Sequence, residues 1–109
     1  MVSLKSIANR IVSQVFAVSS LPEMTIDEYG NKEWRLNGLL HREDGPAIER
    51  KNGDRLWYIN GKSHREDGPA VEYANGSKLW CLNDKSIRYD PKTWDQLIND
   101  IHIESIMNK

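Results

Sequence analysis

The chain has 109 residues, with 15 Lys and Arg against 16 Asp and Glu, so its formal net charge at pH 7 is −1. This length predicts one domain over residues 1–109 with a modest core, and the balanced charge gives no global electrostatic reason to bind nucleic acid or an anionic membrane. The single cysteine, Cys81, excludes an internal disulfide and fits a reducing compartment. No run of apolar residues approaches the ~18 that span a bilayer. We therefore predict a cytoplasmic protein.

The first segment, residues 1–22, is predicted to be an N-terminal helix running over 2–19. Its apolar residues follow helical spacing and form one stripe: Leu4, Ile7, Ala8, Ile11, Val12, Val15 and Phe16. Pro22 ends the helix, because the residue before a proline avoids the helical region. We expect this helix to cover a sheet. Because the segment contains no acidic residue, two alternatives are a transit peptide and, less favoured, a helix lying on a membrane surface.

A seven-residue stretch then occurs twice, at 41–47 and again, letter for letter, at 64–70. We call these the first link and the second link. The offset is 23 residues, and Trp34, Trp57 and Trp80 share it. A third copy decays, because Ile87 stands where the first two copies have histidine. A fixed period of this length predicts a stacked repeat architecture, in which each unit covers the apolar face of its neighbour.

The segment 23–89 has the period of two that is typical of strands. The predicted strands are 24–28, 32–37, 46–50, 55–60, 69–74 and 78–83. Asn-Gly pairs between them supply the left-handed backbone angles of tight turns: they lie at 37–38, 52–53, 60–61 and 75–76. The predicted fold is therefore α+β, an antiparallel meander of about five or six strands built from 23-residue repeats, with a helix at each end.

The last segment, residues 90–109, is predicted to hold a C-terminal helix from about 91 to 106. Asp90 is a good N-cap and Pro91 suits the first helical position. We expect this helix to pack on the sheet and to cap the decayed end of the array, because terminal repeats need a changed outer face. His102 is expected on its surface, and Cys81 is expected to be an inert buried thiol.

A family resemblance covers about residues 28–88 and neither predicted helix. It is carried by Tyr58, Asn60, Gly61, Lys62, His64, Gly68, Ala70, Asn75 and Gly76. In this order and spacing they resemble the MORN repeat. The Arg-Glu-Asp-Gly-Pro-Ala sequence of the links departs from the usual His-Gly-x-Gly and looks more like the diverged arrays of large DNA viruses, bacteriophages and some bacteria. The resemblance implies a scaffold or binding platform without shared catalytic residues.

The charged residues of the two links are the candidate binding residues: His41, Arg42, Glu43, Asp44, His64, Arg65, Glu66 and Asp67. Repetition along an array favours a structural rule, in which His packs against the adjacent strand, Arg pairs with Glu across units, and Asp-Gly-Pro forms a turn. A second reading is a recognition edge whose repeated charges contact a partner. No residue is predicted to be catalytic or to bind a metal, and no cofactor is expected.

The predicted function is a non-enzymatic protein–protein interaction module. The resemblance implies a small phage or viral protein, which would bind a host factor such as a defence protein in the host cytoplasm. One alternative is a metal-dependent hydrolase, since His and carboxylates can bind metal; it would use His41, Glu43, His64 and Glu66. Another is a nucleic-acid binder using the Trp faces with Arg42, Arg55 and Arg65. We expect a protein partner, no nucleic acid and no membrane, and sheet edges open to homo-oligomerisation.

Overall fold

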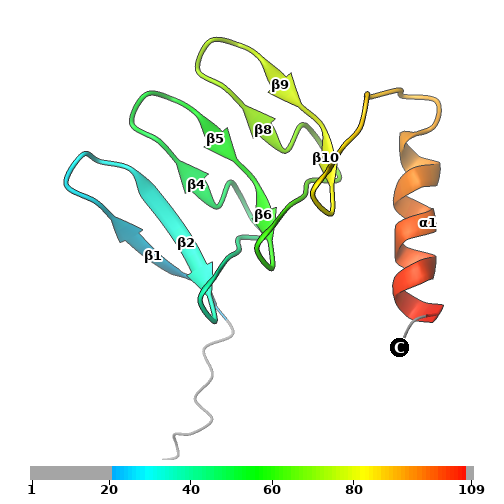
Figure 1. The fold of residues 1–109 in the computed structure, drawn as a ribbon, viewed down its shortest axis with the longest axis horizontal. Helices are drawn as coiled ribbons and strands as arrows, with labels where there is room; N and C mark the ends of the chain where they lie inside the picture. Colours follow the sequence, from blue (N-terminus) through cyan, green and yellow to red (C-terminus); the bar gives the residue numbers. More distant parts are fainter. Residues whose placement is uncertain (1–20, 108–109) are drawn as a thin grey trace, which may run out of the picture.

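The computed structural model describes residues 21–107, and the predicted helix over 2–19 lies outside this range. The fold is α+β: an open antiparallel meander followed by one helix (Figure 1). The elements are β1 (Glu23–Ile26), β2 (Lys32–Leu36), β3 (Leu39–Leu40), β4 (Ile48–Glu49), β5 (Arg55–Leu56), β6 (Tyr58–Ile59), β7 (Lys62–Ser63), β8 (Val71–Glu72), β9 (Lys78–Leu79), β10 (Cys81–Leu82), β11 (Lys85–Ser86) and α1 (Trp94–Met107).

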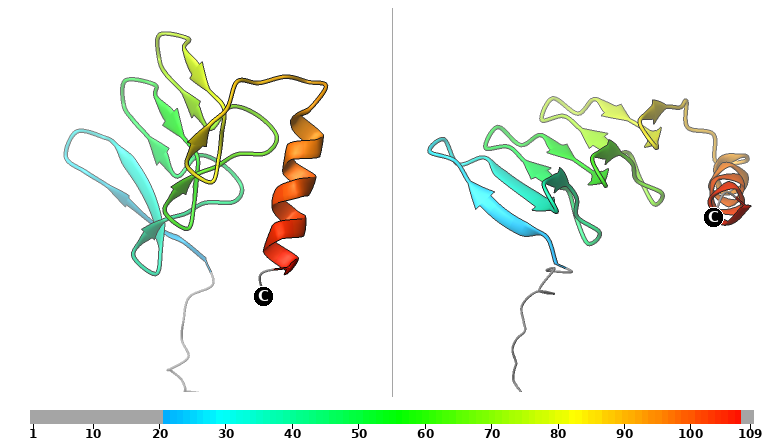
Figure 2. Two further views of the ribbon diagram at one scale, coloured as in Figure 1. Left: turned by 45° about the vertical axis from the view of Figure 1, so that its right-hand side comes forward. Right: turned by 60° about the horizontal axis from the view of Figure 1, so that its bottom comes forward.

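The main sheet has the strand order β1-β2-β4-β5-β8-β9, and β3 pairs with the far end of β2. Three hairpins, β1–β2, β4–β5 and β8–β9, therefore stand side by side, and they form a staggered row in Figure 2. Two short hairpins, β6–β7 and β10–β11, form separate two-stranded sheets below them. All of these pairings are antiparallel.

The prediction of single strands over 55–60 and 78–83 is wrong, because each is broken at its tryptophan. The backbone N–H of Trp57 donates to Ala70 O at 2.8 Å, and its carbonyl accepts from His64 N at 3.1 Å. The strand thus leaves the main sheet at Trp57 and turns to pair with β7. An alternation of apolar residues does not mark such a change of partner. The prediction from the sequence also missed the two-residue strands β3, β7 and β11.

The core lies where strands of adjacent hairpins meet. Ile48 on β4 faces Leu56 on β5, which faces Val71 on β8, and all three side chains are buried. Leu79 on β9 continues this row, but it is 41 % exposed where Leu56 is 8 % exposed. The difference arises because β9 is the last strand and has a neighbour on one side only.

Adjacent hairpins are also joined at their tips by Asp54, whose side chain is buried. Its Oδ1 accepts the backbone N–H of Ala74 from the next hairpin at 2.8 Å, and its Oδ2 accepts from the Asn52 side chain at 3.2 Å. The hydrogen bond from Ala74 lowers the pKa of Asp54 below its usual 3.8, against the opposing effect of burial. One carboxylate therefore ties β4–β5 to β8–β9.

The predicted Asn-Gly turns between the short strands form as expected at Asn60-Gly61, where φ is 51° and 79°. The third unit has Asn83-Asp84 there, with φ of 50° and 71°. A non-glycine residue in this left-handed region is strained. Asp84 Oδ1 accepts the backbone N–H of Ser63 at 2.7 Å, and this hydrogen bond offsets the strain.

The helix α1 begins at Trp94, about three residues later than predicted, because Asp90 first closes a turn. The carbonyl of Asp90 accepts from Thr93 N and Trp94 N, and its Oδ1 accepts from Lys92 N at 2.9 Å. Among residues 21–107, no helix is long and apolar enough to cross a membrane.

Candidate functional site

Arg42 organises the first link. Its Nε donates to Asp44 Oδ1 at 3.0 Å, and its Nη1 donates to the carbonyl of Pro46 and to Glu49 Oε2 at 3.1 and 3.2 Å. Its guanidinium carbon lies 3.9 Å from the centroid of the Trp34 ring. The side chain thus fixes the link to the strands of its own unit by hydrogen bonds and a cation–π contact.

Arg65 makes the same set of contacts in the second link. Its Nε donates to Asp67 at 3.0 Å, its Nη1 donates to Pro69 O and Glu72 Oε2 at 3.0 and 3.2 Å, and its guanidinium lies 3.9 Å from the Trp57 ring centroid. The Arg–Glu pairing joins a link to the strand that follows it within one unit, whereas the sequence predicted a pairing across units.

The glycines of the links are needed for space. A Cβ added to Gly45 would lie 2.9 Å from Arg42 Cζ, and one added to Gly68 would lie 2.7 Å from Arg65 Cζ. Neither glycine has a positive φ. A side chain at either position would therefore displace the guanidinium from its contacts, and the Glu-Asp-Gly stretch forms a bend.

The link histidines connect neighbouring units. His41 Nδ1 accepts the backbone N–H of Asn60 at 3.0 Å, and His64 Nδ1 accepts that of Asn83 at 3.0 Å. An accepting Nδ1 carries no proton, so in each ring the proton lies on Nε2. Nε2 then donates to the carboxylate two residues on, at 3.2 Å in the first link and 2.9 Å in the second.

Glu66 accepts from two histidines, because His102 of α1 also contacts its Oε2, at 3.0 Å. Burial raises the pKa of Glu66, but the hydrogen bonds from His64 and His102 outweigh it, and the pKa lies below its usual 4.5. His102 is exposed on the helix surface, as predicted, and also makes this contact. The second link is thereby the docking point of α1.

In the third unit, aromatic rings replace the arginine contact. Tyr89 stacks on Trp80 with a centroid separation of 3.8 Å, and Trp94 meets the Trp80 ring edge-on at 5.0 Å. Trp94 is buried, and its Nε1 donates to the carbonyl of Glu66 at 2.7 Å. The helix therefore docks at the end of the array through Trp80 and the second link. Cys81 is buried, as predicted.

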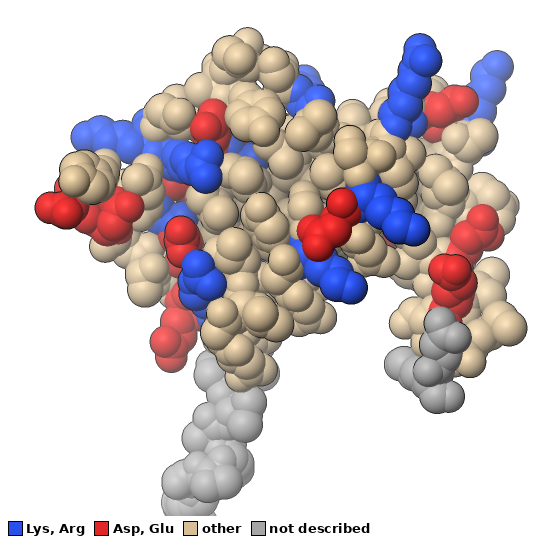
Figure 3. All heavy atoms as spheres, viewed as in Figure 1, with Lys and Arg blue, Asp and Glu red and all other residues tan. Residues whose placement is uncertain are grey.

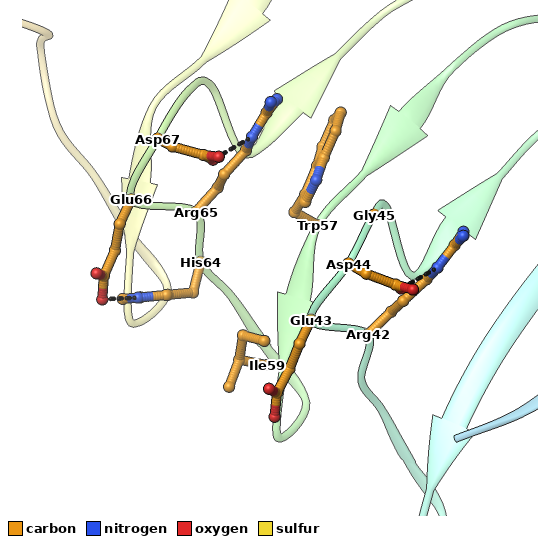
Figure 4. A pocket seen from close by; sticks show the side chains of 10 residues that line it. All are labelled: Arg42, Glu43, Asp44, Gly45, Trp57, Ile59, His64, Arg65, Glu66 and Asp67. Atoms are coloured by element: carbon orange, nitrogen blue, oxygen red, sulfur yellow. Dashed lines mark hydrogen bonds and ion pairs between the residues drawn. The ribbon is translucent and has the colours of Figure 1, made fainter. Parts of the chain in front are cut away.

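A groove of about 790 Å³ lies between the two links. Trp57 and Ile59 stand between the link residues on either side, as Figure 4 shows. Seven of the eight predicted binding residues line this link groove, and the eighth, His41, lines an adjoining hollow of about 430 Å³ beside Trp34. Sequence reasoning missed Ile59; the signal for it was its place two residues after Trp57, on β6.

The most exposed charges in the link groove are negative, although each of these carboxylates also accepts a hydrogen bond within its own link. The side chains of Glu43, Asp44 and Asp67 are 81, 87 and 88 % exposed, whereas those of the two arginines are 21 and 22 % exposed and hydrogen-bonded. For a link histidine to bind a metal, the coordinating nitrogen would have to give up the hydrogen bond that it now makes. Within 21–107 no group of three His, Cys, Asp or Glu side chains is arranged to hold an ion.

Comparisons of the chain with protein-family models, with curated proteins and with solved structures found no match. The resemblance to the MORN repeat stays a prediction from the sequence.

Proposed function

We propose that this protein is a non-enzymatic, MORN-like interaction module whose link groove binds a protein partner in the cytoplasm. The observation that carries the proposal is the groove itself: a hollow with Trp57 at its centre, flanked on each side by a link held in the same conformation. Interfaces favour a rigid aromatic anchor surrounded by polar groups. Because each link is fixed by its arginine, the exposed carboxylates are held in place before a partner arrives, which lowers the entropic cost of binding.

The free charge of the groove favours a partner segment that presents Lys or Arg. Both link arginines are held by acceptors within their own unit and are mostly covered, whereas Glu43, Asp44 and Asp67 are hydrogen-bonded within their links but largely exposed to a partner. This arrangement repels a phosphate backbone and gives no support to the nucleic-acid alternative. The resemblance to phage and viral arrays suggests a host protein, such as a defence protein, as the partner.

The enzyme alternative receives less support from the same geometry. A general acid needs a carboxyl group whose pKa is raised, whereas the pKa of Glu66 is lowered. His64 uses Nδ1 to accept from Asn83 and Nε2 to donate to Glu66, so neither nitrogen is free to take a proton from a substrate.

The test compares capture of a partner by the tagged wild-type protein, by Asp44→Asn/Asp67→Asn, and by the control Asp100→Asn/Glu104→Gln. The first pair of substitutions removes two exposed groove charges and keeps side-chain shape, and the control removes two exposed charges from α1. The partner, identified by mass spectrometry and purified, is then titrated calorimetrically. We expect at least tenfold weaker binding for the groove variant and no change for the control. Equal binding by all three proteins would refute the groove as the binding surface.

A further inference from the structure

The main sheet ends in two strands, β1 and β9, that have no neighbour on their outer sides within residues 21–107. In an antiparallel ladder, alternate residues direct their backbone groups to opposite sides. Asp27 N–H donates to Asn31 O across β1–β2, so Met24 and Ile26 direct theirs outward. Lys78 lies on β9 and Trp80 directly after it. In the preceding unit, the residues at these two positions direct their backbone groups toward the next hairpin. Each edge thus presents unpaired donors and acceptors.

The two internal junctions between hairpins share one register. Trp34 N–H donates to Ala47 O and Trp57 N–H donates to Ala70 O, both at 2.8 Å. Continuing this spacing, Trp80 would donate to residue 93, but the chain turns away there into α1, and no strand follows up to residue 107. Going back by the same spacing, Met24 occupies on β1 the place of Ala47 and Ala70. We propose that copies of this protein associate head to tail, with β9 of one copy pairing antiparallel with β1 of the next and Trp80 N–H donating to the carbonyl of Met24.

The side chains at the two edges fit this pairing. Met24, Ile26 and Leu79 are 44, 56 and 41 % exposed, whereas Ala70 and Leu56, inside the sheet, are 0 and 8 % exposed. A neighbouring strand would cover them. Exposed apolar residues along an unpaired strand edge favour pairing with another chain.

The charges at the two ends are opposite. Residues 21–31 hold three acids and no base, Glu23, Asp27 and Glu28. Residues 76–92 hold four bases and two acids: Lys78, Lys85, Arg88, Lys92, Asp84 and Asp90. In Figure 3, acidic groups lie at the left-hand end of the molecule, over the β1–β2 hairpin, with basic side chains beside them, and long basic side chains project at the upper right on either side of an acidic group. Opposite net charges steer the two ends together and disfavour contacts between like ends.

The proposed junction between copies lacks one opposite-charge cross-strand pair that the internal junctions have. The internal junctions pair Lys32 with Glu49 and Arg55 with Glu72. In the proposed junction Lys78 lies opposite Ile26, so the acid that stands opposite the basic residue at each internal junction is missing. We therefore expect association of the wild-type protein to be weak and to be strengthened by Ile26→Glu.

The test is sedimentation velocity over a range of protein concentrations. The wild type should show a mass that rises continuously with concentration, because a head-to-tail contact does not close. Ile26→Glu should tighten association about 1.5- to 5-fold, the effect of an opposite-charge cross-strand pair. Ile26→Pro removes the outward N–H and should abolish association, since proline is tolerated on an open edge. The control Ile106→Glu, on the exposed face of α1, should change nothing.

Lys78→Glu provides a second variant that leaves the backbone intact. It should weaken association of the wild type and reverse the gain of Ile26→Glu, whereas Asp44→Asn/Asp67→Asn should leave association unchanged. A protein that stays monomeric at every concentration, with Ile26→Glu included, overturns the proposal. A closed dimer, or association that none of the edge substitutions alters, overturns it as well. Neither result bears on partner binding in the link groove.

Discussion

At the scale of single residues, one arginine in each link fixes the surrounding chain. Arg65 binds three oxygens and lies on the Trp57 ring, and a Cβ at residue 68 would displace its guanidinium from this position. Contacts within one unit, and the hydrogen bond that each link histidine accepts from the next unit, thus account for the His, Arg, Glu, Asp and Gly of the link.

Gly68→Ala should therefore lower the free energy of unfolding by about 1–2 kcal/mol, because the new methyl group displaces the guanidinium from its acceptors and from Trp57. The measurement is chemical denaturation of a double-mutant cycle with Arg65→Ala. In the Arg65→Ala background the same glycine substitution should be neutral or slightly stabilising, since alanine restricts the unfolded chain. An equal cost in both backgrounds would show that the glycine is needed for another reason.

The contacts of Asp54 predict how the stability of the protein depends on pH. Its pKa is lowered in the folded protein, so the stability it contributes is fully present above the usual value of 3.8 and is lost as pH falls through the lower, folded-state value. Asp27, whose pKa is lowered chiefly by the backbone N–H of Asn31, and Glu66 act in the same direction. Thermal melts should show Tm falling below about pH 4. Asp54→Asn should have a lower Tm at pH 7 and a shallower decline in acid; a parallel decline would contradict this role.

At the scale of elements, α1 depends on one anchor. A 14-residue helix is marginal by itself, and of its residues only Trp94 is buried, against Trp80, Tyr89 and the carbonyl of Glu66. The late start of the helix follows from this contact, because the turn closed by Asp90 delivers Trp94 to the end of the array.

Trp94→Ala should cost about 3–5 kcal/mol, the usual range for a large buried aromatic residue. The far-ultraviolet circular dichroism signal at 222 nm should also fall, since the undocked helix loses its tertiary support. The control His102→Ala removes an exposed contact to Glu66 and should cost less than about 1 kcal/mol. Retention of the full helical signal in Trp94→Ala would show that α1 is stable without its anchor.

At the scale of the whole molecule, stability comes from contacts between neighbouring hairpins. The buried row of Ile48, Leu56 and Val71 is a small core, and it ends at Leu79, where the sheet ends. Leucine at two equivalent positions, 56 and 79, is therefore buried where another strand lies beside it and exposed where the sheet ends.

Leu56→Ala and Leu79→Ala form a matched pair that tests this dependence. Leu56→Ala should destabilise by about 2–4 kcal/mol, because it leaves a cavity between three strands. Leu79→Ala should cost less than about 1 kcal/mol in dilute protein, since the side chain is 41 % exposed. Urea unfolding at low protein concentration measures both. Similar costs for the two substitutions would show that burial by the next hairpin does not set the stability.

Much of the architecture was predictable because its signals are local. Asn60-Gly61 predicted a turn with two positive φ values, and Asp90 predicted the cap before the last helix. The bend at Trp57 was not predictable from alternation, since it depends on the carbonyl of Ala70, 13 residues away. The sequence predicted the charged residues that line the link groove, but it did not predict the groove itself. Ile59 lines the groove only because the units stack.

The sequence by itself determined the antiparallel meander, its turns, the C-terminal helix and the charged residues of the links. It could do so because each of these follows from spacing and turn chemistry within a few residues. Only the tertiary structure decided which charges are free. Arg42 and Arg65 look available in the sequence, but each is occupied by acceptors up to seven residues away, which leaves the carboxylates to face outward. It also decided that β9 has an open edge, because the path of the chain after Tyr89 is set by packing of Trp94 against distant residues.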